Sequence, residues 1–200
     1  KDKVVYVCSF GSESIVMLDM ISKVSLNTQI IFLNTLKLFG ETILYKNQIL
    51  ELYKFKNFIE IFPDKYDLKS KDPVDDLWSK NSDLCCDIRK VKPLKKALIN
   101  FDAWFSGRKG FHSIERSEKP LIELQDDKFL ISPLLFWKQS RIERYLNEFN
   151  LLKHPLNLLG YKSIGCANCT MKPIKKKNIR SGRWLNSKKT ECGIHNFFKK

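Results

Sequence analysis

The cysteines of this sequence are grouped in a way that allows two kinds of sulfur chemistry. Cys85 and Cys86 are adjacent, Cys166 and Cys169 form a Cys-x-x-Cys pair, and Cys192 stands alone near the C-terminus. Four thiolates in two close pairs can hold a soft metal centre. A separate cysteine among basic side chains can serve as a nucleophile, because nearby cations stabilise the thiolate. The pattern therefore predicts a metal centre and a reactive thiol in one protein.

The spacing of the four paired cysteines bears on the kind of metal centre. A structural zinc ion needs four ligands around one small tetrahedral site, which adjacent residues rarely reach together. Each iron of a four-iron, four-sulfur cube takes one thiolate, so adjacent cysteines can bind different irons. We therefore favour a [4Fe-4S] cluster over zinc, and either of them over four idle thiols.

The residues around Cys192 affect its expected reactivity. Arg180 and Arg183 precede it in a basic stretch, and their charges favour the thiolate. Glu191 opposes this effect, because a neighbouring carboxylate disfavours a second negative charge. We expect Cys192 to lie on an exposed tail, where a cysteine taken alone is more often incidental than catalytic.

A turn rich in serine and glycine follows the first apolar run and contains Ser9, Gly11, Ser12 and Ser14. Glycine lets the backbone curl so that successive N–H groups form an anion-binding nest, and the N-terminus of the following helix adds its positive dipole. No Gly-Lys-Ser/Thr follows, so the turn is not a Walker A loop. It predicts a phosphate or sulfate site, although such a turn is about as often a simple helix cap.

The elements that must position these residues alternate between strands and helices. Strands are expected at Val4–Cys8, Gln29–Leu33 and 58–62, with helices at 15–21 and 41–53. Beyond them we expect a helix at 84–98 interrupted at Pro93, β-structure at 102–107 and 129–135, and a helix at 141–149. The helix at 41–53 is expected to turn inward Ile43, Leu44, Ile49 and Leu50. This order predicts an α/β fold with a mostly parallel sheet and right-handed crossovers.

The composition suits one domain of 200 residues with an ordinary hydrophobic core. No apolar run reaches the roughly eighteen residues of a membrane span, and the N-terminus lacks a signal-peptide core, so we expect a cytoplasmic protein without membrane contact. In that compartment six cysteines favour metal binding or catalysis over disulfides. The net charge of +14 favours an anionic partner, which leaves open nucleic acid, an acidic protein or a small polyanion.

Six segments form a more specific set: Ser9-Phe10-Gly11-Ser12-Glu13-Ser14, Lys37-Leu38-Phe39-Gly40-Glu41-Thr42, Leu84-Cys85-Cys86-Asp87-Ile88-Arg89-Lys90-Val91, Trp104-Phe105-Ser106-Gly107-Arg108-Lys109, Gly160-Tyr161-Lys162-Ser163-Ile164-Gly165-Cys166-Ala167-Asn168-Cys169, and Arg180-Ser181-Gly182-Arg183-Trp184 leading to Glu191-Cys192-Gly193-Ile194-His195. Together they resemble the assimilatory adenylyl-sulfate reductases, which are similar to the 3′-phosphoadenylyl-sulfate (PAPS) reductases and to the PP-loop ATP-pyrophosphatase group. In this resemblance the four paired cysteines are typical of the branch that uses adenylyl sulfate (APS). Both branches share the Glu-Cys-Gly-Ile/Leu-His tail.

The resemblance implies a single PAPS reductase-like domain over residues 1–200. Its α/β nucleotide-binding core would span 1–150, and the cluster loop and catalytic C-terminal tail would span 151–200. The implied fold is of the PP-loop (adenine nucleotide alpha hydrolase-like) type, a twisted, mostly parallel sheet flanked by helices. A loop-rich C-terminal segment and a mobile tail would complete it.

The resemblance also implies a reaction. The Cys192 thiolate would attack the sulfur of APS, release AMP and form an S-sulfocysteine, from which a thiol of thioredoxin or glutaredoxin would release sulfite. One [4Fe-4S] cluster with a structural and electrostatic role would be held by Cys85, Cys86, Cys166 and Cys169. Neither nucleic acid nor a membrane is implied as a partner. The implied substrate-binding residues are Ser9, Gly11, Ser12, Ser14, Lys90, Arg180, Arg183 and His195.

Two positions depart from the family pattern, and two other functions stay open. Leu36 stands where the family commonly has glycine, and His112 where relatives often have glutamine. A PAPS reductase that carries a cluster is an alternative, because selection depends on a few contacts to the 3′ position. An iron-sulfur regulator or nucleic-acid-binding module also fits the charge and the four thiols. That second alternative leaves the Ser-Gly turn and Cys192 without a role.

Overall fold

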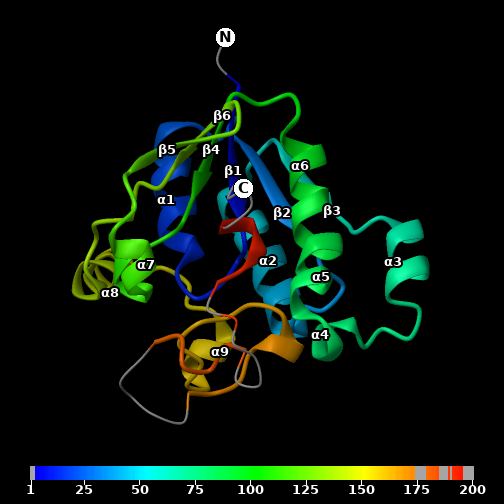
Figure 1. Ribbon diagram of the computed structural model, residues 1–200. Helices are drawn as coiled ribbons and strands as arrows, with labels where there is room; N and C mark the ends of the chain where they lie inside the picture. The colour runs from blue at the N-terminus through cyan, green and yellow to red at the C-terminus, as the bar shows by residue number, and fades with distance from the viewer. Residues whose placement is uncertain (1–2, 174–178, 185–188, 190, 196–200) are drawn as a thin grey trace.

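The computed structural model describes residues 3–173, 179–184, 189 and 191–195. A six-stranded sheet forms its centre, in the order β3-β2-β1-β4-β6-β5 (Figure 1). All neighbouring strands are parallel except β5 and β6, which form an antiparallel pair at one edge. The strands are β1 (Val4–Cys8), β2 (Gln29–Leu33), β3 (Phe58–Ile61), β4 (Ala103–Ser106), β5 (Ile122–Gln125) and β6 (Lys128–Ile131). The predicted mostly parallel α/β sheet is confirmed.

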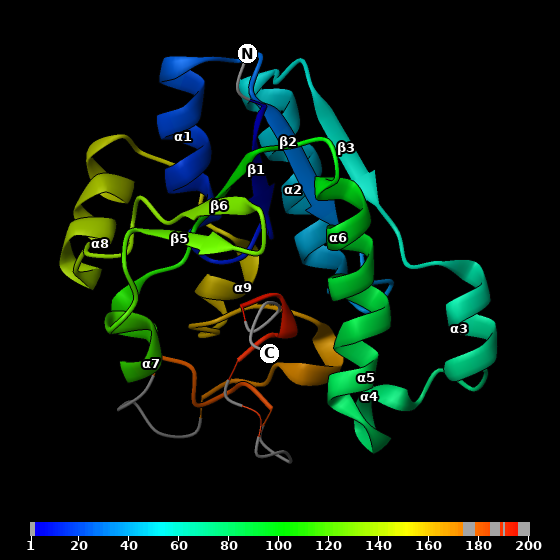
Figure 2. The same cartoon turned by 45° about the horizontal axis from the view of Figure 1, so that its top comes forward.

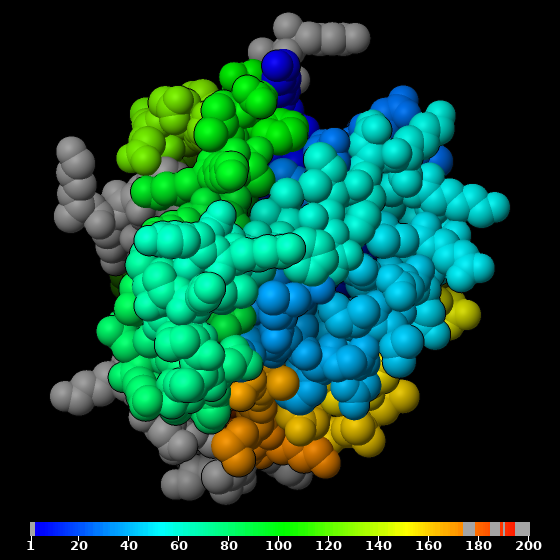
Figure 3. Space-filling view, turned by 90° about the vertical axis from the view of Figure 1, so that its right-hand side faces the viewer, coloured from blue at the N-terminus to red at the C-terminus, as the bar shows by residue number. Residues whose placement is uncertain are grey.

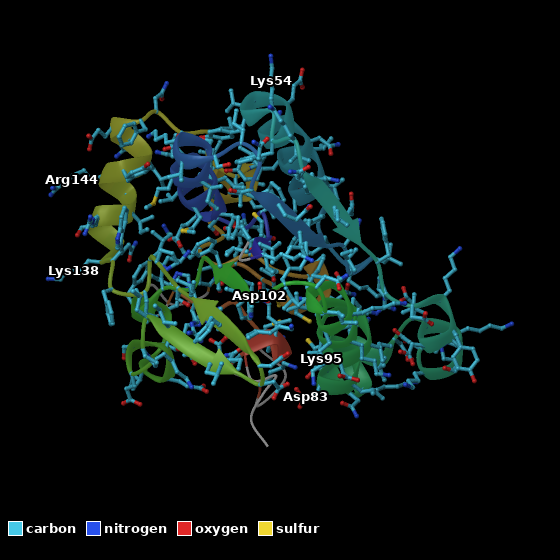
Figure 4. All side chains as sticks on the ribbon, turned by 90° about the horizontal axis from the view of Figure 1, so that it is seen from above. Lys54, Asp83, Lys95, Asp102, Lys138 and Arg144 are labelled. Carbon is cyan, nitrogen blue, oxygen red and sulfur yellow. The ribbon has the colours of Figure 1, made fainter. Side chains whose placement is uncertain are left out.

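Helices cover both faces of this sheet, because its central strands are apolar on both sides. Residues from α1 (Ser14–Val24), α2 (Gly40–Tyr53) and α8 (Gln139–Glu148) share one apolar cluster with β1 and β2. On the other face α6 (Lys92–Leu98) packs Leu94 and Leu98 against Val5, Ile31 and Trp104. The result is a three-layer arrangement that leaves the carboxyl ends of the parallel strands open at one edge. At the rim, Lys54, Lys138 and Arg144 are exposed and point outward (Figure 4).

The expected helix at 84–98 consists of three consecutive segments. These are α5 (Ser82–Cys86), a π-helical turn η1 (Asp87–Val91), and α6, which has Pro93 in its first turn. Proline is tolerated there because the first N–H groups of a helix have no intrahelical partner. The π-turn brings Lys90 and the cysteines of α5 into one region next to the sheet edge, and π-turns often occur at functional sites.

The inward face predicted for the second helix is partly wrong. Leu44 is 63% exposed, whereas Tyr45 and Lys46 are buried. The buried polar groups have partners: the Tyr45 hydroxyl donates to the carbonyl of Leu152 (2.6 Å), and the Lys46 ammonium lies 2.7 Å from Glu60 of β3. Because these long-range partners offset the cost of burial, hydrophobicity alone indicated the wrong face.

Several short elements were not expected. Strand β5 was missed, and the β-structure expected at 129–135 ends at Ile131. The remaining short helices are α3 (Lys65–Lys71), α4 (Leu77–Lys80), η2 (Gly110–His112), α7 (Ile114–Ser117), α9 (Pro155–Leu158), η3 (Ala167–Cys169) and η4 (Gly193–His195). Among the described residues, no helix is both long and apolar enough to cross a lipid bilayer.

The late part of the chain returns to the carboxyl edge of the sheet. Cys166 forms an isolated β-bridge with Leu38, and the N–H of Ala167 donates to the carbonyl of Lys37 (2.7 Å). In Figure 3 this segment, drawn in orange, lies directly below the blue residues that follow β2. The short helix η4 lies against α5 and η1 (Figure 2). Residues more than 100 positions apart in sequence are thus brought to one edge.

Candidate active site

A cavity of about 160 Å³ opens at the carboxyl ends of β1 and β4, and we call it the main cavity. Ligands of open parallel sheets commonly bind at this edge. Most of its walls come from four parts of the chain: the β1–α1 turn, the loop after β4 together with α7, the segment 163–165, and the late residues Arg180, Arg183, Trp184, Cys192 and Ile194. The cavity brings together most of the predicted site residues, namely Ser9, Gly11, Ser12, Ser14, Lys90, Arg180, Arg183 and Cys192.

The Ser-Gly turn has a compact shape maintained by its own side chains. The Gly11 N–H donates to the Ser14 hydroxyl (2.9 Å), and the hydroxyls of Ser9 and Ser14 lie 3.3 Å apart. Phe10 has a left-handed backbone (φ 46°) and inserts its ring edge-on against Phe32, 5.3 Å between centroids. The buried Phe10 ring therefore anchors the turn to the core, while serine and backbone groups on either side face the cavity.

Cys192 is buried, contrary to the expectation of an exposed tail cysteine. A hydrogen bond with Cys86 and the charges of Lys90 and Arg183 lower the pKa of the Cys192 thiol well below its usual value, against the effect of burial. Burial disfavours the charged form of Lys90, but the thiolates of Cys166, Cys192 and Cys86 raise its pKa. If Cys86 binds iron it has no proton to donate, and the cations of Lys90 and Arg183 remain to favour the thiolate.

Glu191 does not oppose the Cys192 thiolate as the sequence suggested. Burial alone would raise the pKa of Glu191, but hydrogen bonds from Arg116 and the charge of Arg180 lower it. The Glu191 carboxylate is therefore ionised and is neutralised by two arginines on the cavity wall. Because the carboxylate is paired with these two cations, its repulsion of the neighbouring thiolate is largely offset.

Lys109, His112 and Arg116 also line the main cavity, although they were not among the predicted site residues. The Lys109 ammonium lies 2.5 Å from the carboxylate of Glu13, which immediately follows Ser12 in the turn. His112 Nε2 lies 3.4 Å from the same carboxylate. Burial lowers the pKa of His112 to about 4, so its ring is neutral near pH 7. Arg116 is the third, and its partner lies 75 positions away, so no local pattern indicated it.

Two indole groups in the main cavity have unused hydrogen-bonding capacity. Trp104 and Trp184 are buried, and within the described part of the chain their Nε1–H groups have no acceptor. Indole N–H is a donor only, so these groups match oxygen atoms of a bound ligand. The Trp184 ring also lies 4.3 Å from the Arg183 guanidinium, which helps to hold that arginine at the cavity.

The four paired cysteines line a second, smaller cavity, here called the cysteine cavity. Cys85 and Cys86 come from α5, and Cys166 and Cys169 from the loop that crosses the end of β2. Lys90 lines both cavities. Arg89 holds the walls together: it donates to the Thr35 carbonyl (2.9 Å) and to the Asp72 carboxylate (2.6 Å). All four cysteines are free thiols.

The four paired thiols provide a donor set of sulfur alone. No three His, Cys, Asp or Glu side chains among the described residues surround one point closely enough to hold an ion. A zinc ion requires four ligands within about 2.3 Å of one centre, whereas each corner of an iron-sulfur cube takes its own thiolate. Four sulfurs around one cavity, without oxygen or imidazole ligands, match the donor set of the cube.

One predicted residue cannot be placed. The backbone of His195 ends η4, but its side chain lies outside the described residues. Lys37 lines the cysteine cavity and forms an ion pair with Asp75. Residues 163–165 line the main cavity.

The fold and the cavity define an α/β protein of the PP-loop type, with a cavity lined by cationic side chains and the Ser-Gly turn at the carboxyl ends of its parallel strands. Residues 3–172 match the phosphoadenosine phosphosulfate reductase domain, and the chain belongs to this family. It is 40% identical over 190 residues to the adenosine 5′-phosphosulfate reductase of Chelativorans sp. (strain BNC1), covering 94% of this chain and 77% of that protein.

Solved structures agree with this assignment. The phosphoadenylyl-sulfate reductase of Candida auris, in a phosphate complex, has a TM-score of 0.71 at 28% identity, covering 86% of this chain and 84% of the other. The FMN adenylyltransferase of Candida glabrata has a TM-score of 0.64 at 15% identity, covering 94% of this chain and 66% of the other, and so shares the fold alone. The predicted family and PP-loop fold are confirmed.

Proposed function

We propose that this protein is an oxidoreductase that converts APS to sulfite and AMP in assimilatory sulfate reduction, with Cys192 as the nucleophile. The observation that carries the proposal is geometric: the buried Cys192 thiol shares one cavity with the Ser-Gly turn and with the cations of Lys90 and Arg183. The family supports it, as does the name adenosine 5′-phosphosulfate reductase carried by its curated relatives.

The reaction consists of two displacements. The Cys192 thiolate attacks the sulfate sulfur, the bond from sulfur to the phosphate oxygen breaks, and AMP leaves with that electron pair. The product on the protein is an S-sulfocysteine. A thiolate of thioredoxin or glutaredoxin then attacks Cys192 Sγ, sulfite leaves, and a second thiol of the reductant resolves the mixed disulfide. Sulfur gains two electrons, and the dithiol of the reductant is oxidised to a disulfide.

Each group in the main cavity has a role in the first displacement. The Ser-Gly turn, with Ser9, Gly11, Ser12 and Ser14, cradles the phosphosulfate through hydroxyls and N–H groups. Lys90 and Arg183 offset the negative charge that gathers as one anion attacks another. The indole N–H groups of Trp104 and Trp184 donate hydrogen bonds to ligand oxygens. Arg180 and His195 complete the proposed set of substrate-binding residues.

An anaerobic assay of sulfite release tests the function. With reduced thioredoxin, we expect sulfite from APS at a rate well above that from PAPS, and none with Cys192→Ser. Omission of thioredoxin should abolish sulfite release and limit AMP to about one equivalent per chain, because the adduct is not reduced. Equal or better use of PAPS would replace the proposed substrate with its 3′-phosphorylated form. Sulfite formation by Cys192→Ser would refute the proposed nucleophile.

We further propose that Cys85, Cys86, Cys166 and Cys169 hold one [4Fe-4S] cluster. When bound, the cluster supplies a fixed charge and links α5 to the 166–169 loop. The residues of the chain carry out the displacement: Lys90, on the wall between the two cavities, faces both the cysteines and the nucleophile. A cytoplasmic location agrees with reduced thiols and a protein reductant.

The metal content of the protein provides the corresponding test. Anaerobically purified protein should be brown and contain about four irons per chain. Cys169→Ser should lose the colour and most of the iron. Cys8→Ala is the matched control, because Cys8 is buried in the core away from the cysteine cavity and should leave the iron content unchanged. A colourless protein with one zinc per chain would contradict the cluster.

A further inference from the structure

A buried ion pair connects the segment that carries Cys192 to the opposite wall of the main cavity. The Glu191 carboxylate accepts a hydrogen bond from Arg116 Nε (2.8 Å) and another from Arg116 Nη2 (2.7 Å). The two side chains are only 2% and 8% exposed. Arg180 Nη2 lies 3.3 Å from the same carboxylate. A two-point contact of this kind fixes both distance and orientation, which a single charge contact does not.

Arg116 itself stands on a well-anchored support. It lies in α7, where the Ser113 hydroxyl accepts a hydrogen bond from the Arg116 N–H (3.3 Å). Just before α7, the Gly110 N–H donates to the Leu135 carbonyl (2.8 Å). A Cβ at Gly110 would lie 2.8 Å from that carbonyl oxygen, so backbone packs directly on backbone there. The arginine is thus a fixed point to which the late segment attaches.

The segment is held on both sides of Cys192. Glu191 precedes Cys192 directly, so the ion pair restrains the sulfur through a single peptide link of about 3.8 Å between Cα atoms. On the other side, Gly193 packs against Val91 and Cys86, and Ile194 packs on the apolar cluster that contains Trp104. A polar contact and an apolar contact therefore flank the nucleophile.

We propose that Arg116 is a positioning residue, whose ion pair with Glu191 holds Cys192 inside the main cavity. The two-point contact fixes the residue next to Cys192 to α7, and Cys192 itself is only 8% exposed. Retention of the sulfur is independent of the reaction that Cys192 performs, so this role does not rest on the proposed function.

Alkylation of Cys192 by iodoacetamide, followed by peptide mass analysis, measures this retention without substrate. In the reduced wild-type protein we expect slow labelling of Cys192. Arg116→Met and Glu191→Gln should each accelerate it by about tenfold, since a buried charge pair broken on one side releases its segment faster. Arg116→Met is the decisive variant, because removal of a nearby cation would by itself slow the reaction of a thiolate, so faster labelling there reports exposure.

The double variant separates this role from direct binding of substrate by Arg116. If the two residues act through one contact, adding Arg116→Met to Glu191→Gln should raise the labelling rate of Cys192 by less than a further twofold. Arg116→Lys keeps the charge but loses the two-point contact. Its labelling rate should lie between those of the wild type and Arg116→Met. Glu60→Gln breaks the Lys46–Glu60 pair, and Glu60 lies on β3 outside the main cavity, so labelling should not change.

Three outcomes overturn the proposal. Unchanged labelling in both single variants would mean that the ion pair does not hold Cys192. Independent, multiplying effects of the two substitutions on the labelling rate would mean that the two residues act separately. If Arg116→Met raises KM for APS while Glu191→Gln does not, Arg116 binds the substrate directly. Accelerated labelling in both single variants of a protein whose wild type produces no sulfite from APS would instead contradict the proposed function and leave the positioning role standing.

Discussion

Leu36 holds a backbone conformation that leucine rarely adopts. Its φ is 60°, in the left-handed region, where a Cβ meets the following carbonyl. The conformation is imposed by its neighbours: the Asn34 side chain accepts the Leu36 N–H (3.0 Å), and the Thr35 hydroxyl accepts the Lys37 N–H (3.2 Å). Glycine, which the family commonly has here, adopts it without strain. Leu36 therefore replaces the glycine of the family at the cost of backbone strain, which the hydrogen bonds of the turn offset.

Replacement of Leu36 by glycine should stabilise the protein. The relief of left-handed strain exceeds the additional chain entropy of glycine, so we expect the free energy of unfolding to rise by about 0.5–1 kcal/mol. The side chain is 54% exposed, so little packing is lost. Leu36→Ala is the control, because alanine removes the side chain but keeps the strain. Denaturant unfolding that ranks Leu36→Ala at or above Leu36→Gly would contradict this explanation.

At the scale of elements, a charged network joins the β1–α1 turn to the loop after β4. Glu13 of the turn lies between Lys109 and His112 of that loop. Against the effect of burial, these neighbours lower the pKa of Glu13 to about 2. Burial lowers the pKa of His112 to about 4. The two loops that form opposite walls of the main cavity are thus tied together when Glu13 is ionised and His112 is neutral.

This network predicts that acid destabilises the protein in two stages. The folded protein binds a proton at His112 less readily than the unfolded chain does. The stability that neutral His112 contributes is therefore complete above pH 6.5 and is lost as the pH falls toward about 4. Ionised Glu13 stabilises the folded protein fully above pH 4.5, and this stabilisation is lost as the pH falls toward about 2. Each such group adds at most about 1.4 kcal/mol per pH unit to the slope of stability against pH.

His112→Gln, the residue often present in relatives, provides the measurement. His154 has the same lowered pKa of about 4, so the variant should remove about half of the stability loss that the two histidines cause between pH 6.5 and 4.5. Urea unfolding at several pH values in that range gives the slope. An unchanged slope in His112→Gln would show that His112 is already protonated in the folded protein.

The elements also show where sequence reasoning worked. The parallel strands and long helices were predicted because apolar residues recur with the correct period. Strand β5 was missed because Ile122 and Leu124 are exposed at a sheet edge, so the strand lacks a clear buried face. The face of α2 was misassigned because Lys46 is buried against a partner on another strand. Partners distant in sequence leave no periodic pattern.

At the scale of the whole molecule, the fold brings three distant parts of the chain to one edge of a sheet. The Ser-Gly turn, η1 and the segment ending in η4 meet at the main cavity, with the cysteine cavity adjoining it at Lys90. The cysteines, Lys90 and Arg183 could be named from their motifs. Glu13, Lys109 and Arg116 could not, because their roles arise from pairings across 75 or more positions.

The central claim is that Cys192 forms a covalent adduct with the sulfonate of APS. The direct measurement is the mass of the peptide that contains Cys192, after the reduced protein is incubated anaerobically with APS and without any thiol reductant. We predict a gain of one SO₃ group at Cys192, one equivalent of AMP in solution, and loss of the adduct when thioredoxin is added. Release of AMP or sulfite while this peptide keeps its original mass would contradict the account.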